Sequence, residues 1–292
     1  MRSPTQHSIH RLLVLRQFPG FADAELEVLA VIGENVQEVQ FAANAVVAPA
    51  GRIPALQLVV EGRIDVGPRS YGPREVFGSL EVIAGRMLAV PAIAAVPTRV
   101  LQVAPADFAN LLEDNFGLLS NVRRSLAREL LAAGPRAYVR PRLPYTVRTD
   151  TLGLVDRLVL LRHQITFATG RIQALASLAQ ATREVRIAAG EPITRAGAPA
   201  TASYIIIDGA ARTTDGRTLG PNDALGGVES LAETTYALTA EAITPVRVLE
   251  TPSISLFDVI EDHTDLALAL IGRLASELLD LEPELAPLAR VN

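Results

Sequence analysis

The sequence predicts an α+β, mostly β fold in which two tandem β-rolls of the jelly-roll type each carry flanking N-terminal and C-terminal helices. Three observations predict it. The second half of the chain resembles the first half. Within each half, short apolar stretches alternate with turn residues at the spacing of a closed all-β unit. Apolar stripes with helical periodicity open and close each half.

The internal repeat begins at the first apolar segment, where Arg11-Leu-Leu-Val-Leu-Arg16 corresponds to Arg157-Leu-Val-Leu-Leu-Arg162. Chance does not keep such pairs in order along a whole chain, so the pattern indicates a duplication. We expect a first domain over residues 1–133, a Pro- and Arg-rich linker over 134–150 and a second domain over 151–292. With two one-residue insertions, the further pairs are Phe21 and Phe167, Leu29 and Leu175, Gly51 and Gly197, Gly62 and Gly209, Gly78 and Gly226, and Leu126 and Leu274.

Each half is predicted to start with two helices. An apolar helical segment, Leu12–Leu15 or Leu158–Leu161, precedes a second helix, Asp23–Ile32 or Arg171–Leu178.

Short strands follow these helices. Val39–Phe41 and Val185–Ile187 alternate apolar and polar residues, and Asn44 or Gly190 comes soon after. Both of these residue types tolerate a positive φ, so they predict the same turn. The predicted core strands are Leu56–Val60, which ends at Gly62, and Tyr204–Ile207, which ends at Gly209.

A closing helix ends each half, and its apolar stripe is a candidate surface for self-association. The stripe residues are Leu119, Val122, Leu126 and Leu130 in the first half, and Leu270, Leu274, Leu278 and Leu281 in the second.

Composition excludes several kinds of chemistry. The chain has 292 residues, of which 49% are hydrophobic and 20% charged, and all 27 basic residues are Arg. The lack of Cys and Lys excludes thiol nucleophiles, Schiff bases and a P-loop. The four His (His7, His10, His163 and His263) are scattered, so we expect no metal site and no enzyme activity, and a cupin-like metal site on the strands is not expected.

The charge and the apolar runs bear on partners and location. The net charge of −5 gives no overall footprint for nucleic acid. The longest apolar run, Met87–Pro97, is too short to cross a bilayer, and the N-terminus lacks a secretory signal. We therefore expect a soluble, cytoplasmic protein with no membrane partner.

Several motifs resemble the cyclic-nucleotide-binding domain of CRP-like regulators. They are Gly190-Glu-Pro-Ile193 with Gly197, Tyr204-Ile-Ile-Ile-Asp-Gly209, Leu219-Gly-Pro221 with Asp223, and Gly226 in the second half, and Leu56-Gln-Leu-Val-Val-Glu-Gly62, Tyr71-Gly-Pro73 and Phe77-Gly78 in the first. The resemblance implies a β-roll that binds a ligand in a loop reading Phe-Gly-Glu and later Pro-Arg-Ala-Ala. In that family the Glu accepts a hydrogen bond from a ribose hydroxyl, and the Arg binds the cyclic phosphate.

Both charged positions of this loop differ in both halves. Ser79 and Leu88 stand at them in the first half, and Gly227 and Tyr236 in the second. The resemblance therefore implies degenerate sites and no bound cofactor; a cyclic nucleotide is possible but not favoured. The candidate ligand-binding residues are Phe77, Gly78, Ser79, Glu81, Leu88, Ala89, Leu225, Gly226, Gly227, Glu229, Tyr236 and Ala237.

Three features have alternative interpretations. Glu81 and Glu229, at matched positions, are either relocated ligand acceptors or acids favoured by a helix N-terminus. Tyr236 either contacts a ligand or fills the cup of the roll, the space behind the ligand loop. The linker, with Arg136, Arg140, Arg142, Arg148, Tyr138 and Tyr145, is either a contact for nucleic acid or a stiff connector.

The sequence thus favours a non-catalytic regulatory or adaptor protein that acts through protein–protein contacts. Its closing helices are expected to pair within one chain or between two chains. Many bacterial members of the family carry a helix-turn-helix after the closing helix, and we expect none here. The alternatives are a sensor that binds a cyclic nucleotide or another small molecule unconventionally, and a nucleic-acid-associated regulator that uses the Arg-rich linker.

Overall fold

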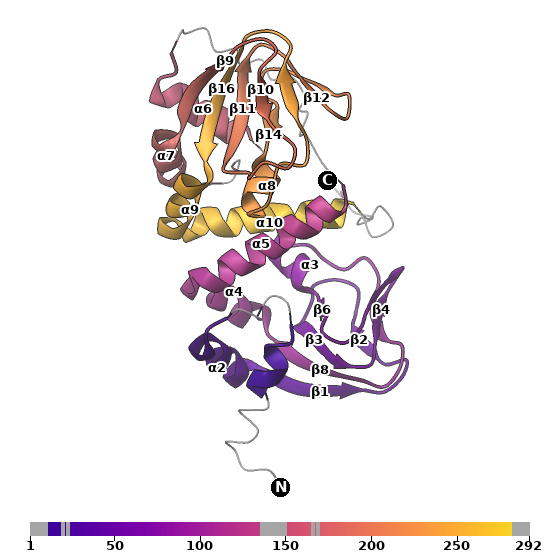
Figure 1. Ribbon diagram of the computed structural model, residues 1–292. Coiled ribbons are helices and arrows are strands. Elements are labelled where there is room, and N and C mark those ends of the chain that lie inside the picture. The colour runs from indigo at the N-terminus through magenta and orange to yellow at the C-terminus, as the bar shows by residue number, and fades with distance from the viewer. Residues whose placement is uncertain are drawn as a thin grey trace. The chain divides into compact units, whose positions relative to one another are not determined.

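The computed structural model describes residues 11–18, 21, 24–134, 151–164, 167 and 170–281, and Figure 1 shows its elements. The chain divides into two compact units. The first unit takes the chain up to Ser125 together with the segment from Ile271 onward, and the second unit takes Leu126–Leu270. Each unit contains one β-roll, named here the first roll (β1 to β8) and the second roll (β9 to β16).

In the first half of the chain, residues 11–15 are helical. The elements that follow are α2 (Leu26–Asn35), β1 (Gln37–Phe41), β2 (Val46–Ala48), β3 (Leu56–Glu61), β4 (Ile64–Val66), β5 (Arg69–Tyr71), β6 (Val76–Phe77), α3 (Ser79–Ala84), β7 (Ala92–Ala94), β8 (Thr98–Val103), α4 (Pro105–Asp114) and α5 (Phe116–Ala132).

The second half follows the same order. Its elements are α6 (Leu154–His163), α7 (Ile172–Ala181), β9 (Arg183–Ile187), β10 (Pro192–Thr194), β11 (Ala202–Asp208), β12 (Ala211–Thr213), β13 (Thr218–Leu219), β14 (Ala224–Leu225), α8 (Gly227–Leu231), β15 (Ala240–Ala242), β16 (Val246–Pro252), α9 (Ser253–Asp262) and α10 (Thr264–Asp280).

Each roll consists of two four-stranded antiparallel sheets. The strand orders are β1-β8-β3-β6 and β2-β7-β4-β5 in the first roll, and β9-β16-β11-β14 and β10-β15-β12-β13 in the second. Corresponding strands therefore occupy corresponding places in the two rolls. The predicted fold class, two tandem jelly-rolls with flanking helices, is confirmed.

The core of each roll lies between its two sheets. In the first roll the apolar cluster unites Val59 and Val100 of one sheet with Ile64 and Ala92 of the other. The second cluster combines its two sheets in the same way. In β4 and β7 burial alternates along the strand, as the period-two pattern predicts, whereas the central strands β3 and β16 are buried at four consecutive residues.

Left-handed turns mark the predicted ends of strands. Asn44 and Gly190 have φ values of 65° and 83°, which confirms the predicted turn. Gly62 and Gly209 have φ values of 91° and 88°. A Cβ atom at Gly62 would lie 2.5 Å from the carbonyl oxygen of Pro97, so this position excludes any side chain.

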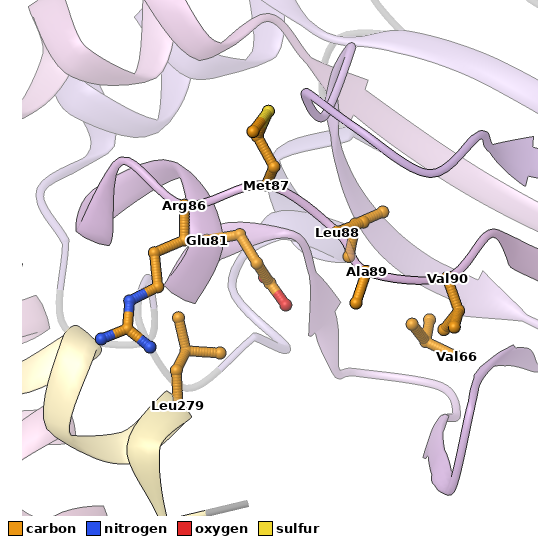
Figure 2. A pocket seen from close by; sticks show the side chains of 8 residues that line it. All are labelled: Val66, Glu81, Arg86, Met87, Leu88, Ala89, Val90 and Leu279. Carbon is orange, nitrogen blue, oxygen red and sulfur yellow. The ribbon is translucent and has the colours of Figure 1, made fainter. Parts of the chain in front are cut away.

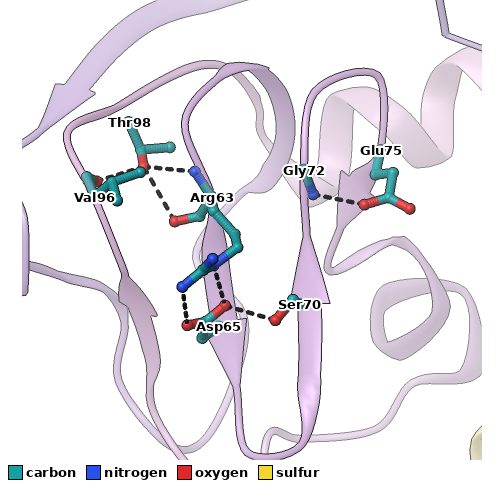
Figure 3. A network of polar contacts seen from close by, with 7 residues as sticks. All are labelled: Arg63, Asp65, Ser70, Gly72, Glu75, Val96 and Thr98. Atoms are coloured by element: carbon teal, nitrogen blue, oxygen red, sulfur yellow. Dashed lines mark hydrogen bonds and ion pairs between the residues drawn. The ribbon is translucent and has the colours of Figure 1, made fainter.

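A polar network fixes the hairpin beyond Gly62 in the first roll (Figure 3). The Thr98 hydroxyl accepts a hydrogen bond from the Arg63 N–H at 3.1 Å and donates to the Val96 carbonyl at 2.7 Å. The Asp65 carboxylate accepts hydrogen bonds from Arg63 Nε at 3.0 Å and from the Ser70 hydroxyl at 2.7 Å. These contacts satisfy the polar groups of the turn and explain the residue types there.

Two helices were not expected from the sequence. α4 and α9 each precede the long closing helix of their half, α5 or α10. Pro105 is the first residue of α4, and Pro252 immediately precedes α9. Proline is favoured at such helix starts. The second helices also begin and end later than predicted, since α2 ends at Asn35 and α7 at Ala181.

The apolar stripes of the closing helices are covered within the single chain. Leu119, Leu126 and Leu130 are buried and Val122 is half-buried; Leu270, Leu274 and Leu278 are buried too, and Leu281 is half-buried. Their pairing with a second chain stays a prediction.

The described His residues make separate local contacts. His163 Nδ1 lies 2.7 Å from the Val159 carbonyl oxygen, and His263 Nε2 lies 3.2 Å from the Ser177 hydroxyl. Among the residues with described positions, no cluster of His, Asp and Glu is suited to hold a metal ion. In the same part of the chain, no helix is both long and apolar enough to span a bilayer. The predicted linker residues after Gly134, together with His7 and His10, lie outside the described residues.

Candidate functional site

The predicted ligand loop of the second roll begins where β14 ends. Leu225, the last residue of β14, pairs with Tyr204 of β11, and Gly226 then adopts a φ of 72°. This left-handed residue turns the chain into the short helix α8. The predicted loop residues Leu225 and Gly226 thus lie together at one end of the second roll.

Tyr236 fills the space behind this loop. Its side chain is buried, and a Cβ atom added to Gly226 would lie 2.6 Å from its Cε1 atom. The hydroxyl donates to the Ala202 carbonyl at 2.8 Å and accepts from the Ala202 N–H at 3.3 Å. β14 ends opposite Tyr204, so it offers no residue to pair with Ala202. The Tyr236 hydroxyl supplies the hydrogen-bond partners that a longer strand would have given.

The environment keeps the Tyr236 hydroxyl protonated. Burial raises the pKa of Tyr236 far above its ordinary range, and the neighbouring Tyr204 hydroxyl adds to this shift. Burial also raises the pKa of Tyr204. A neutral phenol can donate and accept at once, which is what Ala202 requires.

Glu229 lies in the same loop, on α8, and is buried. Its Oε1 atom accepts a hydrogen bond from the Ala237 N–H at a long 3.5 Å. Burial raises the pKa of the Glu229 carboxyl, while backbone N–H groups partly oppose this shift. The Glu229 carboxyl therefore lies next to the backbone amide of Ala237, the residue that follows Tyr236.

The first roll has the same backbone with different side chains. Gly78 has a φ of 91° and leads into α3. Leu88 is buried in the core of the roll, and its backbone forms two hydrogen bonds with Gly51, of 2.8 and 2.9 Å. The side chain of Ile53 lies against the loop glycine here, as Tyr236 does in the second roll. A Cβ atom on Gly78 would lie 3.1 Å from the Cγ2 atom of Ile53.

A pocket opens beside α3 in the first unit (Figure 2). It is small: the cavity volume open to the centres of water-sized molecules is about 20 Å³. Its lining residues are Val66, Glu81, Arg86, Met87, Leu88, Ala89, Val90 and Leu279. Arg86 donates from Nη1 to Asp280 Oδ1 at 2.7 Å, and both residues belong to the first unit. Glu81 is buried, whereas Met87 is exposed.

Apart from Gly78, described above, the structure separates the predicted candidates into four groups. Glu81, Leu88 and Ala89 line the first pocket, and Leu225, Gly226, Glu229, Tyr236 and Ala237 form the second loop. Phe77 lies in the core, where its ring stands 5.4 Å from that of Tyr71. Ser79 and Gly227 are half-buried at the starts of α3 and α8.

Sequence reasoning missed three contacts of these loops. They are the Ala202 backbone beneath Tyr236, Ile53 over Gly78, and Asp280 on Arg86. Asp280 lies 194 residues from Arg86 in the chain. No local pattern signals such a distant pair.

Comparison with known proteins gives one family match. Residues 184–263, which run from β9 to the residue after α9, match the family model of the cyclic nucleotide-binding domain. No protein of curated function matches the chain.

Solved structures with a similar chain course include two kinase regulatory proteins and a bacterial regulator. The regulatory domain of Toxoplasma gondii PKA with cAMP is 16% identical, with 95% of this chain and 99% of that chain covered and a TM-score of 0.36. The regulatory subunit of a cAMP-independent protein kinase A from Trypanosoma brucei is 16% identical, with 96% and 95% covered and a TM-score of 0.37. The N-terminal domain of a transcriptional regulator from Streptomyces coelicolor is 23% identical, with 44% and 97% covered and a TM-score of 0.39.

Proposed function

We propose that this chain is a non-catalytic regulatory protein built from two degenerate copies of a cyclic nucleotide-binding domain, and that it acts through contacts with a protein partner. The observation that carries the proposal is the position of Tyr236. In the roll that contains the family match, a side chain of the protein itself fills the space behind the ligand loop.

A duplication accounts for the matched topology of the two rolls. The strand order β1-β8-β3-β6 has its counterpart in β9-β16-β11-β14. Left-handed glycines recur at corresponding turns, as with Gly62 and Gly209 or Gly78 and Gly226. One ancestral domain copied in tandem would give this correspondence without any further assumption.

A ligand in the second roll would have to displace Tyr236. This breaks two hydrogen bonds to Ala202, and a typical hydrogen bond contributes about 0.5–1.5 kcal/mol to stability. It also exposes a buried aromatic ring, which costs about 1.5–3 kcal/mol more. Together these costs of about 2.5–6 kcal/mol weaken binding by about a hundredfold to ten-thousandfold.

The ligand would also lack its charged partners. Gly227 and Tyr236 stand where the family has Glu and Arg, and Ser79 and Leu88 do so in the first roll. Each charge-assisted hydrogen bond contributes about 1.5–3 kcal/mol, and an Arg fork makes two. Their loss weakens phosphate binding by about a hundredfold to ten-thousandfold.

Exposed apolar side chains favour a protein partner. Val155 on α6, Ile172 on α7 and Ile254 on α9 are 71%, 67% and 71% exposed. Within the second unit α7 packs against both α6 and α9. Contiguous exposed apolar patches mark protein–protein contacts, and we propose that these three side chains contribute to one.

Isothermal titration of the full chain with cAMP and cGMP tests the proposal. We expect no micromolar binding of either nucleotide. The double variant Gly227→Glu/Tyr236→Arg should gain binding, because it restores both charged groups and removes the ring. A side chain at Gly227 has room, since a Cβ atom there meets nothing within 4 Å.

Tyr236→Phe is the matched control for this experiment, because it keeps the ring and adds no charge. It should not gain binding. The corresponding pair Ser79→Glu/Leu88→Arg gives a second route through the first roll. Micromolar binding of cAMP or cGMP by the unchanged chain would contradict the proposal.

A further inference from the structure

β9 is an edge strand of the second roll. It pairs with β16 on one side, and among the described residues no strand pairs with its other side. Val185 lies opposite Val248 of β16 in this ladder. Val248 is fully buried, whereas Val185 is only half-buried. The outer side of β9 is therefore partly accessible, and an edge strand of this kind offers its backbone N–H and C=O groups to a further strand.

The sequence of β9 is self-complementary in an antiparallel register. It reads Arg183-Glu-Val-Arg-Ile187. If two copies of β9 pair around Val185, the residues directly opposite each other are Val185 and Val185, Glu184 and Arg186, and Arg183 and Ile187. Charged residues usually protect an edge strand from pairing. Here they attract each other instead, because each Glu faces an Arg of the other copy.

The core of the roll fixes the face on which each contact forms. Val185 and Ile187 pack against the core, so Glu184 and Arg186 point to the opposite face of the sheet. In the paired strands the two Val185 side chains would meet on the core face, and both Glu–Arg contacts would form on the other face. A shift of one residue would place apolar side chains opposite charged ones, so the register is specific.

Glu184 has acceptor capacity for a second copy. Its Oε1 atom accepts a hydrogen bond from Arg247 Nε at 2.9 Å, and its Oε2 atom accepts one from the Leu152 N–H at 3.0 Å. Burial raises the pKa of the Glu184 carboxyl, but the hydrogen bonds from Leu152 and Arg247 outweigh burial and lower the pKa overall. The ionised carboxylate has about four acceptor positions. Arg186 lies opposite Arg247 in the ladder, and a further acid beside it would offset this like-charge contact.

The first roll lacks this self-complementarity. Its edge strand β1 reads Gln37-Glu-Val-Gln-Phe41, and Val39 corresponds to Val185 in the repeat. Two β1 strands paired around Val39 would put Glu38 opposite Gln40, without any contact of opposite charges. A β1 strand paired with a β9 strand would form one Glu–Arg contact instead of two. Pairing of β9 with β9 is therefore the favoured combination.

We propose that two copies of this chain associate through β9, in an antiparallel pair centred on Val185 that joins the sheets of their second rolls. The contact is isologous, so it closes as a dimer. The joined sheet runs β14-β11-β16-β9 in one copy and continues with β9-β16-β11-β14 in the other. Five residues per strand form a small interface, so the dimer is a reversible one. This goes beyond the proposed function, because the partner is a second copy and the contact uses neither closing helix.

Disulfide trapping tests the register directly, because the chain has no Cys of its own. In Val185→Cys the two introduced thiols would face each other with their Cβ atoms about 4.5 Å apart, within reach of a disulfide. Mild oxidation should therefore link two copies. Val39→Cys, at the corresponding half-buried position on β1, is the matched control and should stay unlinked. Absence of the Val185→Cys dimer, or equal linking of both variants, would overturn the proposal.

Sedimentation equilibrium measures the association without a cross-link. We expect the unchanged chain to be largely dimeric at about 0.1 mM and to dissociate on dilution. Arg186→Glu turns both Glu–Arg contacts into Glu–Glu contacts, so it should weaken the dimer by about tenfold or more. Gln40→Glu, at the corresponding exposed position on β1, should leave the dimer unchanged.

A chain that is monomeric at this concentration would show the proposal to be wrong, and so would an Arg186→Glu dimer as strong as that of the unchanged chain. Neither measurement involves cAMP, cGMP or a different protein partner. Failure of this inference is therefore distinct from failure of the proposed function.

Discussion

At the residue scale, Tyr236 and Glu229 show two ways of burying a polar group. The Tyr236 hydroxyl meets both the N–H and the carbonyl of Ala202, so its hydrogen-bonding capacity is used. The Glu229 carboxyl accepts one long hydrogen bond, 3.5 Å from the Ala237 N–H. A buried carboxylate costs more than a buried carboxylic acid. The second loop therefore stabilises the neutral Tyr236 hydroxyl, whereas it disfavours the ionised form of Glu229.

Glu229→Gln tests this charge cost. Burial raises the pKa of Glu229, so the folded chain holds this proton more tightly than the unfolded chain does. The free energy of unfolding that the bound proton contributes is fully present below the ordinary glutamate pKa. It is lost as the pH rises through the raised pKa of Glu229. We expect Glu229→Gln to have a higher free energy of unfolding than the unchanged chain at pH 7 and an equal one near pH 4. Urea unfolding across this range measures it.

Glu241→Gln, at an exposed position on β15, is the matched control and should leave the pH profile unchanged. A Glu229→Gln variant that is less stable than the unchanged chain at pH 7 would show that the carboxylate is stabilising.

At the scale of elements, the turn at Gly209 illustrates how a close backbone approach fixes a residue type. Gly209 follows β11, and its φ is 88°. A Cβ atom there would lie 2.3 Å from the carbonyl oxygen of Pro245. Gly216, in the turn between β12 and β13, has the same φ but open space around it. The two glycines therefore differ only in the steric requirement.

This pair predicts different costs for the same substitution. Gly216→Ala should lower the free energy of unfolding by about 1–2 kcal/mol, the cost of a left-handed alanine. Gly209→Ala should lower it by about 3 kcal/mol or more, because the carbonyl of Pro245 must also move. Denaturant unfolding of the two variants compares them directly. Equal losses would contradict the steric explanation.

The elements also show how far the sequence predicts the structure. The β-rolls could be predicted because alternation and glycine turns are local patterns, and the turns at Asn44 and Gly190 are confirmed. α4 and α9 were missed, although proline stands at their starts, because each merges with the longer apolar pattern that follows. The loop positions were found by counting from the loop glycines. The partners Ala202 and Asp280 could not be found, since only folding brings them near.

At the scale of the whole molecule, the two compact units do not follow the repeat. The closing helix α5 belongs to the first unit up to Ser125 and to the second unit from Leu126. α10 changes unit between Leu270 and Ile271. In the first unit, Leu279 of α10 lines the pocket beside α3. Each half of the sequence thus supplies a helical segment to the unit formed mainly by the other half.

This composition predicts that the halves depend on each other. A fragment of residues 1–133 lacks buried residues such as Ile271 and Leu279, and each large apolar side chain contributes about 1.5–3 kcal/mol when buried. We expect this fragment to unfold at a lower temperature than the full chain and to recover when mixed with a fragment of residues 151–292. Circular dichroism and size-exclusion chromatography measure both effects.

A fragment of residues 151–270, which ends before the segment that joins the first unit, is the control and should not restore stability. If residues 1–133 alone were as stable as the full chain, the segment from Ile271 onward would not be needed for the stability of the first unit.

The division of α10 between the two units also sets the order in which they can be completed during synthesis. The ribosome completes the first roll early, but the first unit also needs the segment that begins at Ile271. At about 5–20 residues per second, the chain between Ser125 and Ile271 takes roughly 7 to 30 s to translate. During this interval the first roll waits with part of its helical cover missing. The first unit is therefore begun first and finished last.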